Sequence, residues 1–186
     1  NIFRKLMRFT AFVSFPAMLG LAIVSQELIV ISITEKWLPC VPVMQILCVW
    51  GAFMPISTLY SNLMNSIGRP NVYMWNTIAL GIFQLLCVWG SYPYGLNIML
   101  IVYTAANIFW LLIWHYFAHK HIGISLLNTL KDIAPYLIIS VAVMTFTYWV
   151  AGYVKNIYLS LLAKIALAAS LYIFLMWSLK STVFRE

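Results

Sequence analysis

The chain has 186 residues, of which 64% are hydrophobic and 8% are charged, and its formal net charge is +7. Water-soluble domains carry roughly 25% charged residues, so this chain has too little polar material to cover a surface that faces water. The composition excludes a soluble enzyme, a nucleic-acid-binding domain and a disordered tail. It predicts a polytopic membrane protein, which has the lipid bilayer as a partner.

Six apolar stretches are long enough to cross a bilayer as helices, which takes about 20 residues at a rise of about 1.5 Å each. In chain order they cover residues 9–33, 41–64, 72–89, 96–118, 133–151 and 157–179. A transmembrane β-barrel would need segments of about ten residues with alternating polarity, and these runs do not alternate. We therefore expect an all-α fold, a polytopic membrane helical bundle of about six transmembrane helices.

The lysines and arginines between the spans predict the orientation, because cytoplasmic segments are enriched in these residues. With the N-terminal flank inside, the inner set is Arg4, Lys5, Arg8, Arg69, Lys120, Lys131, Lys180 and Arg185. The outer set is then only Lys36 and Lys155. This asymmetry predicts that both ends of the chain are cytoplasmic.

The connection over residues 119–132 alternates apolar and polar residues, and we expect it to form a short amphipathic helix on the cytoplasmic face. The chain would then consist of four helices over 1–118, this linker, and a C-terminal hairpin over 133–186. The first residue is not methionine, and basic residues lead directly into the first span. The sequence is therefore also interpreted as a fragment whose start lies upstream.

Several short motifs follow one another between residues 15 and 71. They are Phe15-Pro16, Gly20-Leu21, Glu27-Leu28-Ile29, Glu35-Lys36-Trp37-Leu38-Pro39, Val43-Met44-Gln45-Ile46-Leu47, Pro55, Asn62-Leu63 and Gly68-Arg69-Pro70-Asn71. This order of a proline-containing helix, an acidic-Lys-Trp outer loop, a second helix and a Gly-Arg inner turn resembles the C-terminal part of bacterial polysaccharide and O-antigen flippases. These transporters form part of the multidrug/oligosaccharidyl-lipid/polysaccharide flippase superfamily.

The resemblance implies that the six spans correspond to helices 9–14 of a fourteen-helix protein, whose N-terminal helices are missing from this chain. It implies that the protein moves a lipid-linked oligosaccharide, such as an O-antigen, capsule or exopolysaccharide repeat unit, across the bacterial plasma membrane by alternating access. Such a protein is not an enzyme and needs no cofactor, although a proton or sodium gradient could drive it. Thr34 departs from the family, which often has glycine before the Glu-Lys-Trp turn.

Ionisable residues within spans are costly and are therefore candidates for function. Lys164 lies in the last span beside small residues and could bind the phosphate of a lipid-linked sugar. Alternatively, its long stem could carry the ammonium to the membrane interface. Glu27, the acidic residue of the first span, could bind a coupling cation or take up a proton. Alternatively, it could be an interfacial or helix-break residue that is satisfied by water or by one of the missing helices.

Neutral polar residues in the spans could line a path for sugars by hydrogen bonding, or each could tie two helices together. These residues are Gln45, Asn62, Gln84 and Asn107. The array of His115, His119 and His121 could in principle bind zinc, but histidines at a cytoplasmic helix end are the simpler interpretation, and no metal site is predicted. The three cysteines show no metal or disulfide spacing.

Three alternatives to a flippase stay open. A multidrug/cation antiporter of the same superfamily normally has twelve helices, and the extra hairpin over 133–186 argues against it. A membrane-embedded glycan-modifying enzyme would need clustered catalytic groups, for which only the histidine array could serve. A structural membrane subunit is the third alternative.

Overall fold

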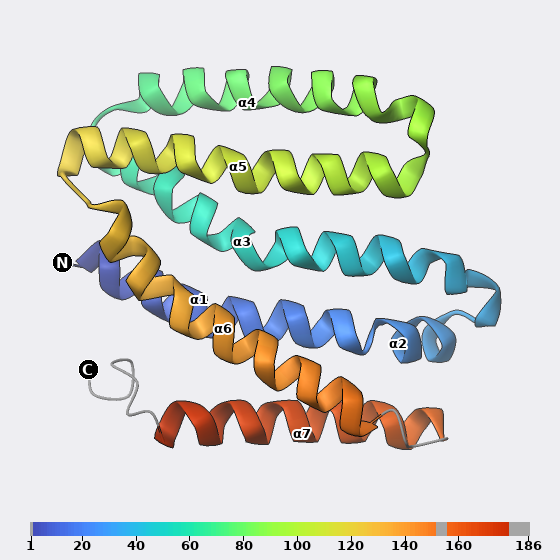
Figure 1. The fold of residues 1–186 in the computed structure, drawn as a ribbon. Helices are drawn as coiled ribbons and strands as arrows, with labels where there is room; N and C mark the ends of the chain where they lie inside the picture. The colour runs from blue at the N-terminus through green and yellow to red at the C-terminus, as the bar shows by residue number, and fades with distance from the viewer. Residues whose placement is uncertain (1, 152–155, 179–186) are drawn as a thin grey trace.

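The computed structural model describes residues 2–151 and 156–178, which form helices joined by short connections (Figure 1). In chain order the elements are α1 (Ile2–Ile23), α2 (Ser25–Ser32), the 3-10 helix η1 (Glu35–Cys40), α3 (Val41–Ser66), α4 (Pro70–Ser91), the 3-10 helix η2 (Tyr92–Tyr94), α5 (Leu96–Ile122), α6 (Leu126–Ala151) and α7 (Ile157–Ser178). Within this described part, six helical stretches are long and apolar enough to cross a membrane. The expected all-α, polytopic helical bundle is confirmed.

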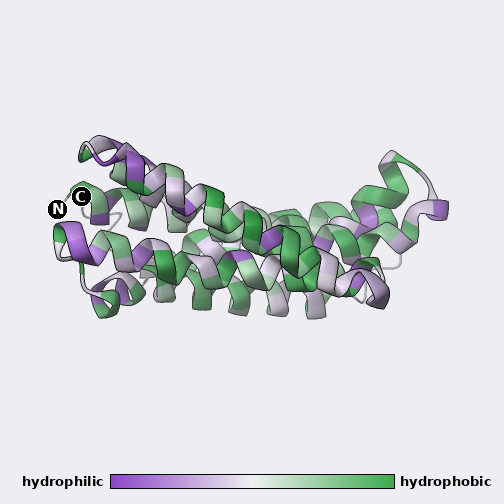
Figure 2. Cartoon of the chain, turned by 90° about the horizontal axis from the view of Figure 1, so that it is seen from above, coloured by the Kyte–Doolittle hydropathy of each residue, from purple (hydrophilic) through white to green (hydrophobic). Residues whose placement is uncertain are grey.

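The long helices lie side by side in a row, in the order α4, α5, α3, α1, α6 and α7 (Figure 1). Seen from above, hydrophobic residues dominate the middle of each helix's length and hydrophilic residues are more frequent towards the helix ends (Figure 2). The exposed faces are apolar: on α4, for example, Ile82, Leu85 and Trp89 are all more than half exposed. Such surfaces suit a bilayer, because lipid tails are as apolar as these side chains.

The core lies around α1, which packs against α3 on one side and α6 on the other. A four-residue spacing places Ala52, Ile56, Tyr60 and Met64 on one face of α3, and all four are buried. Opposite them on α1, the fully buried Phe15 meets a ring of α3 edge to face. The centre of the row is therefore held by close packing between α1 and α3.

Residues 119–132 do not form the separate amphipathic helix that the sequence predicted. Instead α5 continues to Ile122 and α6 begins at Leu126. Gly123 ends α5 in the left-handed conformation, with a φ of 71°, and donates a backbone hydrogen bond of 2.8 Å to the carbonyl of His119. A glycine adopts this conformation without strain. The residues from Leu126 onward are therefore part of α6.

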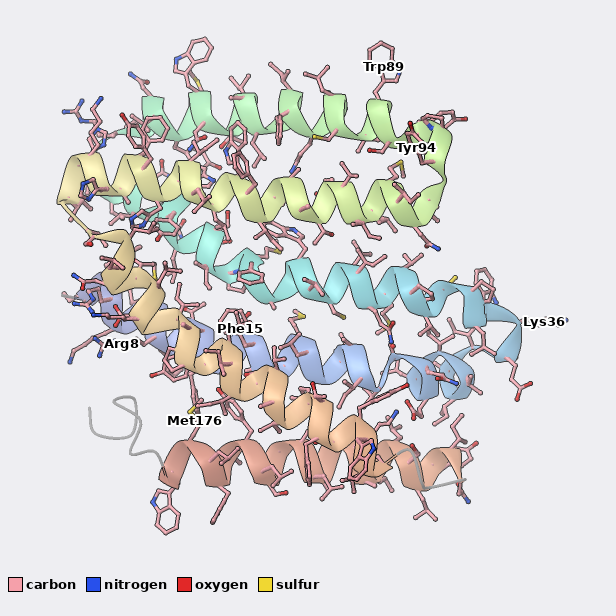
Figure 3. All side chains as sticks on the ribbon, in the orientation of Figure 1. Arg8, Phe15, Lys36, Trp89, Tyr94 and Met176 are labelled. Atoms are coloured by element: carbon pink, nitrogen blue, oxygen red, sulfur yellow. The ribbon has the colours of Figure 1, made fainter. Side chains whose placement is uncertain are left out.

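The two opposite ends of the helices differ in charge (Figure 3). Arg8 lies at one end, and Lys36, Trp89 and Tyr94 lie at the other. The remaining described basic residues of the predicted inner set lie at the termini of helices that meet at the Arg8 end. Three residues of the orientation argument, Lys155, Lys180 and Arg185, lie outside the described residues.

Candidate functional site

The first span predicted from the sequence, residues 9–33, is interrupted at Val24, because α1 ends at Ile23 and α2 begins at Ser25. The backbone at Val24 has a φ of −95° and a ψ of 2°, away from α-helical values. The carbonyl of Ala22 accepts a hydrogen bond from Ser25 Oγ at 2.7 Å and another from Gln45 Nε2 at 3.4 Å. Within a bilayer, backbone groups at a helix break need partners from the protein, and here side chains supply them.

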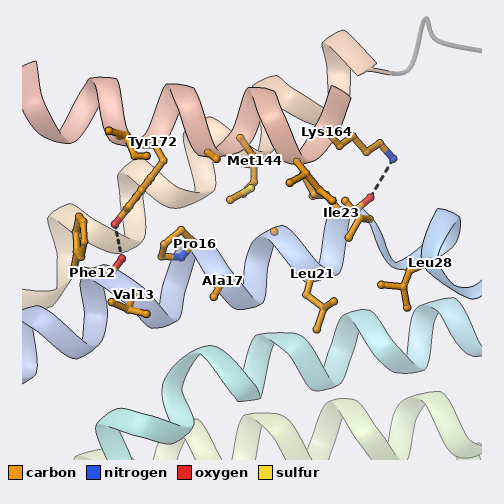
Figure 4. Close-up of a pocket in the computed structure, with 16 residues that line it drawn as sticks. Phe12, Val13, Pro16, Ala17, Leu21, Ile23, Leu28, Met144, Lys164 and Tyr172 are labelled. Atoms are coloured by element: carbon orange, nitrogen blue, oxygen red, sulfur yellow. Dashed lines mark hydrogen bonds between the residues drawn. The ribbon is translucent and has the colours of Figure 1, made fainter. Parts of the chain in front are cut away.

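Lys164 of α7 reaches this break (Figure 4). Its Nζ donates a hydrogen bond of 3.1 Å to the carbonyl of Ile23 and forms an ion pair with Glu27 Oε1. Ser160, one turn earlier on α7, donates a hydrogen bond of 3.0 Å to the same carboxylate oxygen. The structure thus joins two residues that the sequence analysis treated separately, and they are 137 positions apart.

The ion pair is buried: Lys164 is 5% exposed and Glu27 is 8% exposed. The ring of Tyr148 from α6 lies 5.3 Å from Nζ, a favourable distance for a cation–π contact. Glu27 Oε2 is buried without a hydrogen-bond partner among the described residues. Lys164 therefore points into the protein, where Glu27 is its ionic partner.

Lys164 also stands at one end of an apolar groove between α1 and α7, with a volume of about 560 Å³ (Figure 4). Pro16, Leu21 and Ile165 are among the apolar side chains that line it. Towards the other end, the Tyr172 hydroxyl donates a hydrogen bond of 2.9 Å to the carbonyl of Phe12. The groove therefore has an apolar lining with one cationic residue, Lys164, at its end.

The four neutral polar candidates do not converge on one surface. Gln84 Nε2 donates to Asn107 Oδ1 at 2.7 Å, and this bond ties α4 to α5. Gln45 and Asn62 are both exposed on α3, but they lie about 25 Å apart along its axis at about 1.5 Å per residue. The geometry thus gives Gln84 and Asn107 a contact between two helices. Gln45 and Asn62 are exposed, and Gln45 Nε2 also donates to the carbonyl of Ala22.

A second interhelical ion pair, which the sequence analysis missed, lies at the opposite ends of the helices, near the start of α1 and of α6. Asp132 of α6 accepts hydrogen bonds from Arg4 Nε at 2.6 Å and from Arg8 Nε at 2.9 Å. The chain has only four acidic residues against eleven lysines and arginines. This scarcity of acidic residues could have indicated the ion pair, because an acidic residue next to an apolar span has many possible basic partners.

The three histidines separate in the structure. His115 is buried, and its Nδ1 lies 3.0 Å from the hydroxyl of Tyr60. His119 and His121 each place Nδ1 at 2.9 Å from a backbone carbonyl. No cluster of three or more metal-binding side chains occurs in the described ranges.

Parts of the amino-acid sequence are similar to known proteins. Residues 1–42 match the family described as "Polysaccharide biosynthesis protein". An 82-residue stretch is 30% identical to an uncharacterized membrane protein in the cps region of Klebsiella pneumoniae. A stretch of the same length is 30% identical to the lipopolysaccharide biosynthesis protein WzxC of Escherichia coli K12. The resemblance to polysaccharide biosynthesis proteins is confirmed.

The similarity is partial. The aligned stretch covers 44% of this chain and 17% of each of the two relatives. No solved structure matches the chain. The six candidate spans and the partial matches support a multi-pass membrane protein that is similar, over part of its length, to polysaccharide biosynthesis proteins.

Proposed function

We propose that the chain is part of a transporter that flips a lipid-linked oligosaccharide from the inner to the outer leaflet of the bacterial plasma membrane by alternating access. The observation that carries this proposal is the 82-residue similarity to WzxC in a chain with six candidate spans. Further helices of the same protein would complete the path. The helices over 1–118 would belong to its C-terminal transport lobe, and the hairpin over 133–186 would be an addition to that lobe.

The substrate contact that fits this function best is Lys164 with the groove beside it. The ammonium would hold the phosphate of the lipid-linked sugar, and the apolar side chains between α1 and α7 would accommodate part of the lipid tail. The exposed amide of Asn62 would be available for sugar hydroxyls, and the exposed Gln45, whose Nε2 donates to the carbonyl of Ala22, would offer its amide oxygen. A buried charge sheltered from water supports such a role, because intramembrane ionisable residues mark transport paths.

Deletion of the gene tests the proposed function. A strain without the protein should lose surface glycan and accumulate lipid-linked oligosaccharide on the cytoplasmic side, because glycan synthesis continues while export stops. Surface glycan is measured with a specific lectin, and the lipid-linked pool by extraction and mass spectrometry. A complemented strain is the control. Unchanged surface glycan together with an unchanged lipid-linked pool would contradict the proposal.

The orientation gives a second test. We expect position 69 and position 120 to face the cytoplasm and Lys36 and Tyr92 to face outward. Basic residues are more frequent at the helix ends near positions 69 and 120, and cytoplasmic segments are enriched in such residues. Single cysteines placed at these sites in a cysteine-free background, labelled on intact cells with a membrane-impermeant thiol reagent, report the side directly. Labelling should occur at 36 and 92 only, with lysed cells as the control for reactivity. Labelling at 69 or 120 on intact cells would reverse the orientation.

A further inference from the structure

The Lys164 ammonium occupies a place that resembles a cation-binding site. Around it lie the Glu27 carboxylate, the carbonyl of Ile23 at the helix break and the face of the Tyr148 ring. Each of these groups favours positive charge. The second carboxylate oxygen, Glu27 Oε2, is buried and has no hydrogen-bond partner in the part of the chain that the structure describes. The site therefore holds a tethered cation beside an oxygen that is free to accept a proton.

Lys164 is also one of the residues that line the groove between α1 and α7. An anionic headgroup that enters this end of the groove would compete with Glu27 for one positive charge. The lysine stem is flexible, so the ammonium can turn from the carboxylate to the headgroup. Glu27 would then be a buried carboxylate without a counterion, which is strongly unfavourable. A buried carboxylate in this situation becomes neutral by binding a proton.

We propose that Glu27 and Lys164 form an exchange site, in which binding of an anionic lipid headgroup to Lys164 is coupled to uptake of a proton by Glu27. This inference rests on the proposed function, because it takes Lys164 as the headgroup contact. The charges balance. The headgroup phosphate replaces the carboxylate as the partner of the ammonium, the proton from water neutralises the carboxylate, and the net charge of the buried site stays at zero.

The surroundings of Glu27 offer few competing charges. Five described elements, α1, η1, α3, α6 and α7, pack against α2 or carry or contact Lys164. Their other charged or titratable side chains are Arg4, Lys5 and Arg8 of α1, Glu35, Lys36 and Cys40 of η1, Cys48 and Tyr60 of α3, Lys131, Asp132, Tyr136 and Tyr148 of α6, and Tyr158 and Tyr172 of α7. The three basic residues of α1 lie at the far end of that helix. Glu35 and Lys36 are exposed, so water screens them. Lys164 is therefore the cation that controls the charge of Glu27.

Proton counting during lipid binding tests this coupling. The full chain is reconstituted in phosphatidylcholine nanodiscs in weakly buffered solution with a pH-indicator dye. The probe is farnesyl phosphoglucose, a phosphodiester that carries one negative charge and does not titrate near neutral pH. We expect uptake of about one proton for each lipid bound, as linkage requires when a single group changes its protonation. Farnesyl glucoside, which lacks the phosphate, should cause no uptake.

Four variants separate exchange from a structural contact. Glu27→Gln should bind the probe at least as tightly as the wild type but take up no proton, and Lys164→Met should lose both properties. Lys164→Arg should retain both, which shows that a positive charge at this position suffices. Asp132→Asn is the matched control, because it removes the carboxylate of the other interhelical ion pair, and it should also retain both.

Two outcomes would overturn the inference without touching the proposed function. One is probe binding by the wild type with no proton uptake, and the other is wild-type proton uptake by Glu27→Gln. Absence of probe binding by the wild type would also overturn it, since the headgroup would then not reach Lys164. The export measurements on the deletion strain decide on the proposed function independently of all three outcomes.

Discussion

Replacing Lys164 by methionine should lower the free energy of unfolding by about 3–5 kcal/mol, the usual cost of removing one partner from a buried ion pair. Methionine preserves the length and packing of the stem, but it leaves the carboxylate of Glu27 buried without its cation. The loss should grow as the pH rises, because the protonated, neutral form of Glu27 tolerates burial and the charged form does not. Unfolding by SDS in mixed micelles, followed by circular dichroism at several pH values, measures the change.

The double variant Glu27→Gln/Lys164→Met is the control for this prediction. It removes both charges, so most of the lost stability should return, as is observed when buried ion pairs are replaced by neutral groups. In cells, Lys164→Met should reduce surface glycan per protein molecule, whereas Lys164→Arg should retain much of it. Wild-type stability and wild-type export by Lys164→Met would show that neither the buried pair nor the headgroup contact exists.

Replacing Phe15 by alanine should also destabilise the protein strongly. The ring is fully buried between α1 and α3, 5.3 Å from the ring of Phe53. Loss of a buried phenylalanine costs about 3–5 kcal/mol in water-soluble proteins, and we expect the lower end of this range, because transfer of the ring from lipid contributes little. The cavity that remains is the main cost. The same SDS titration measures it.

Phe9→Ala is the matched control on the same helix. Phe9 is 58% exposed, so its removal replaces a contact with lipid and leaves no cavity. Its effect should be within about 0.5 kcal/mol, as for surface substitutions in general. An equal loss of stability in the two variants would mean that the packing between α1 and α3 is not the one described.

The sequence alone was sufficient for the class of the protein and for the six candidate membrane spans that the described residues contain. A bilayer requires about 20 apolar residues for each crossing, and this requirement is visible in local composition without any tertiary information. Local signals were less reliable at element boundaries. The stretch over 119–132 had the pattern of a surface helix, but a glycine at position 123 ended α5 and the following residues joined α6.

The candidate site was predicted residue by residue but not as an arrangement. Lys164 and Glu27 were identified singly, because a charge within an apolar run stands out. Their pairing depends on the helix break at Val24 and on the position of α7 beside α1, and neither leaves a pattern within a single span. The neutral amides illustrate the same limit, since the tie between Gln84 and Asn107 follows from which helices are neighbours.

The sequence by itself therefore determined that this chain crosses a membrane as a set of helices, because hydropathy is a property of each segment taken alone. The tertiary structure decided which polar groups meet. In an apolar environment every buried charge must find a partner, and which partner it finds depends on the packing order of helices that are far apart in the chain. Asp132 shows this most clearly, since two arginines from the first helix hold an acid that the sequence analysis had assigned to a surface linker.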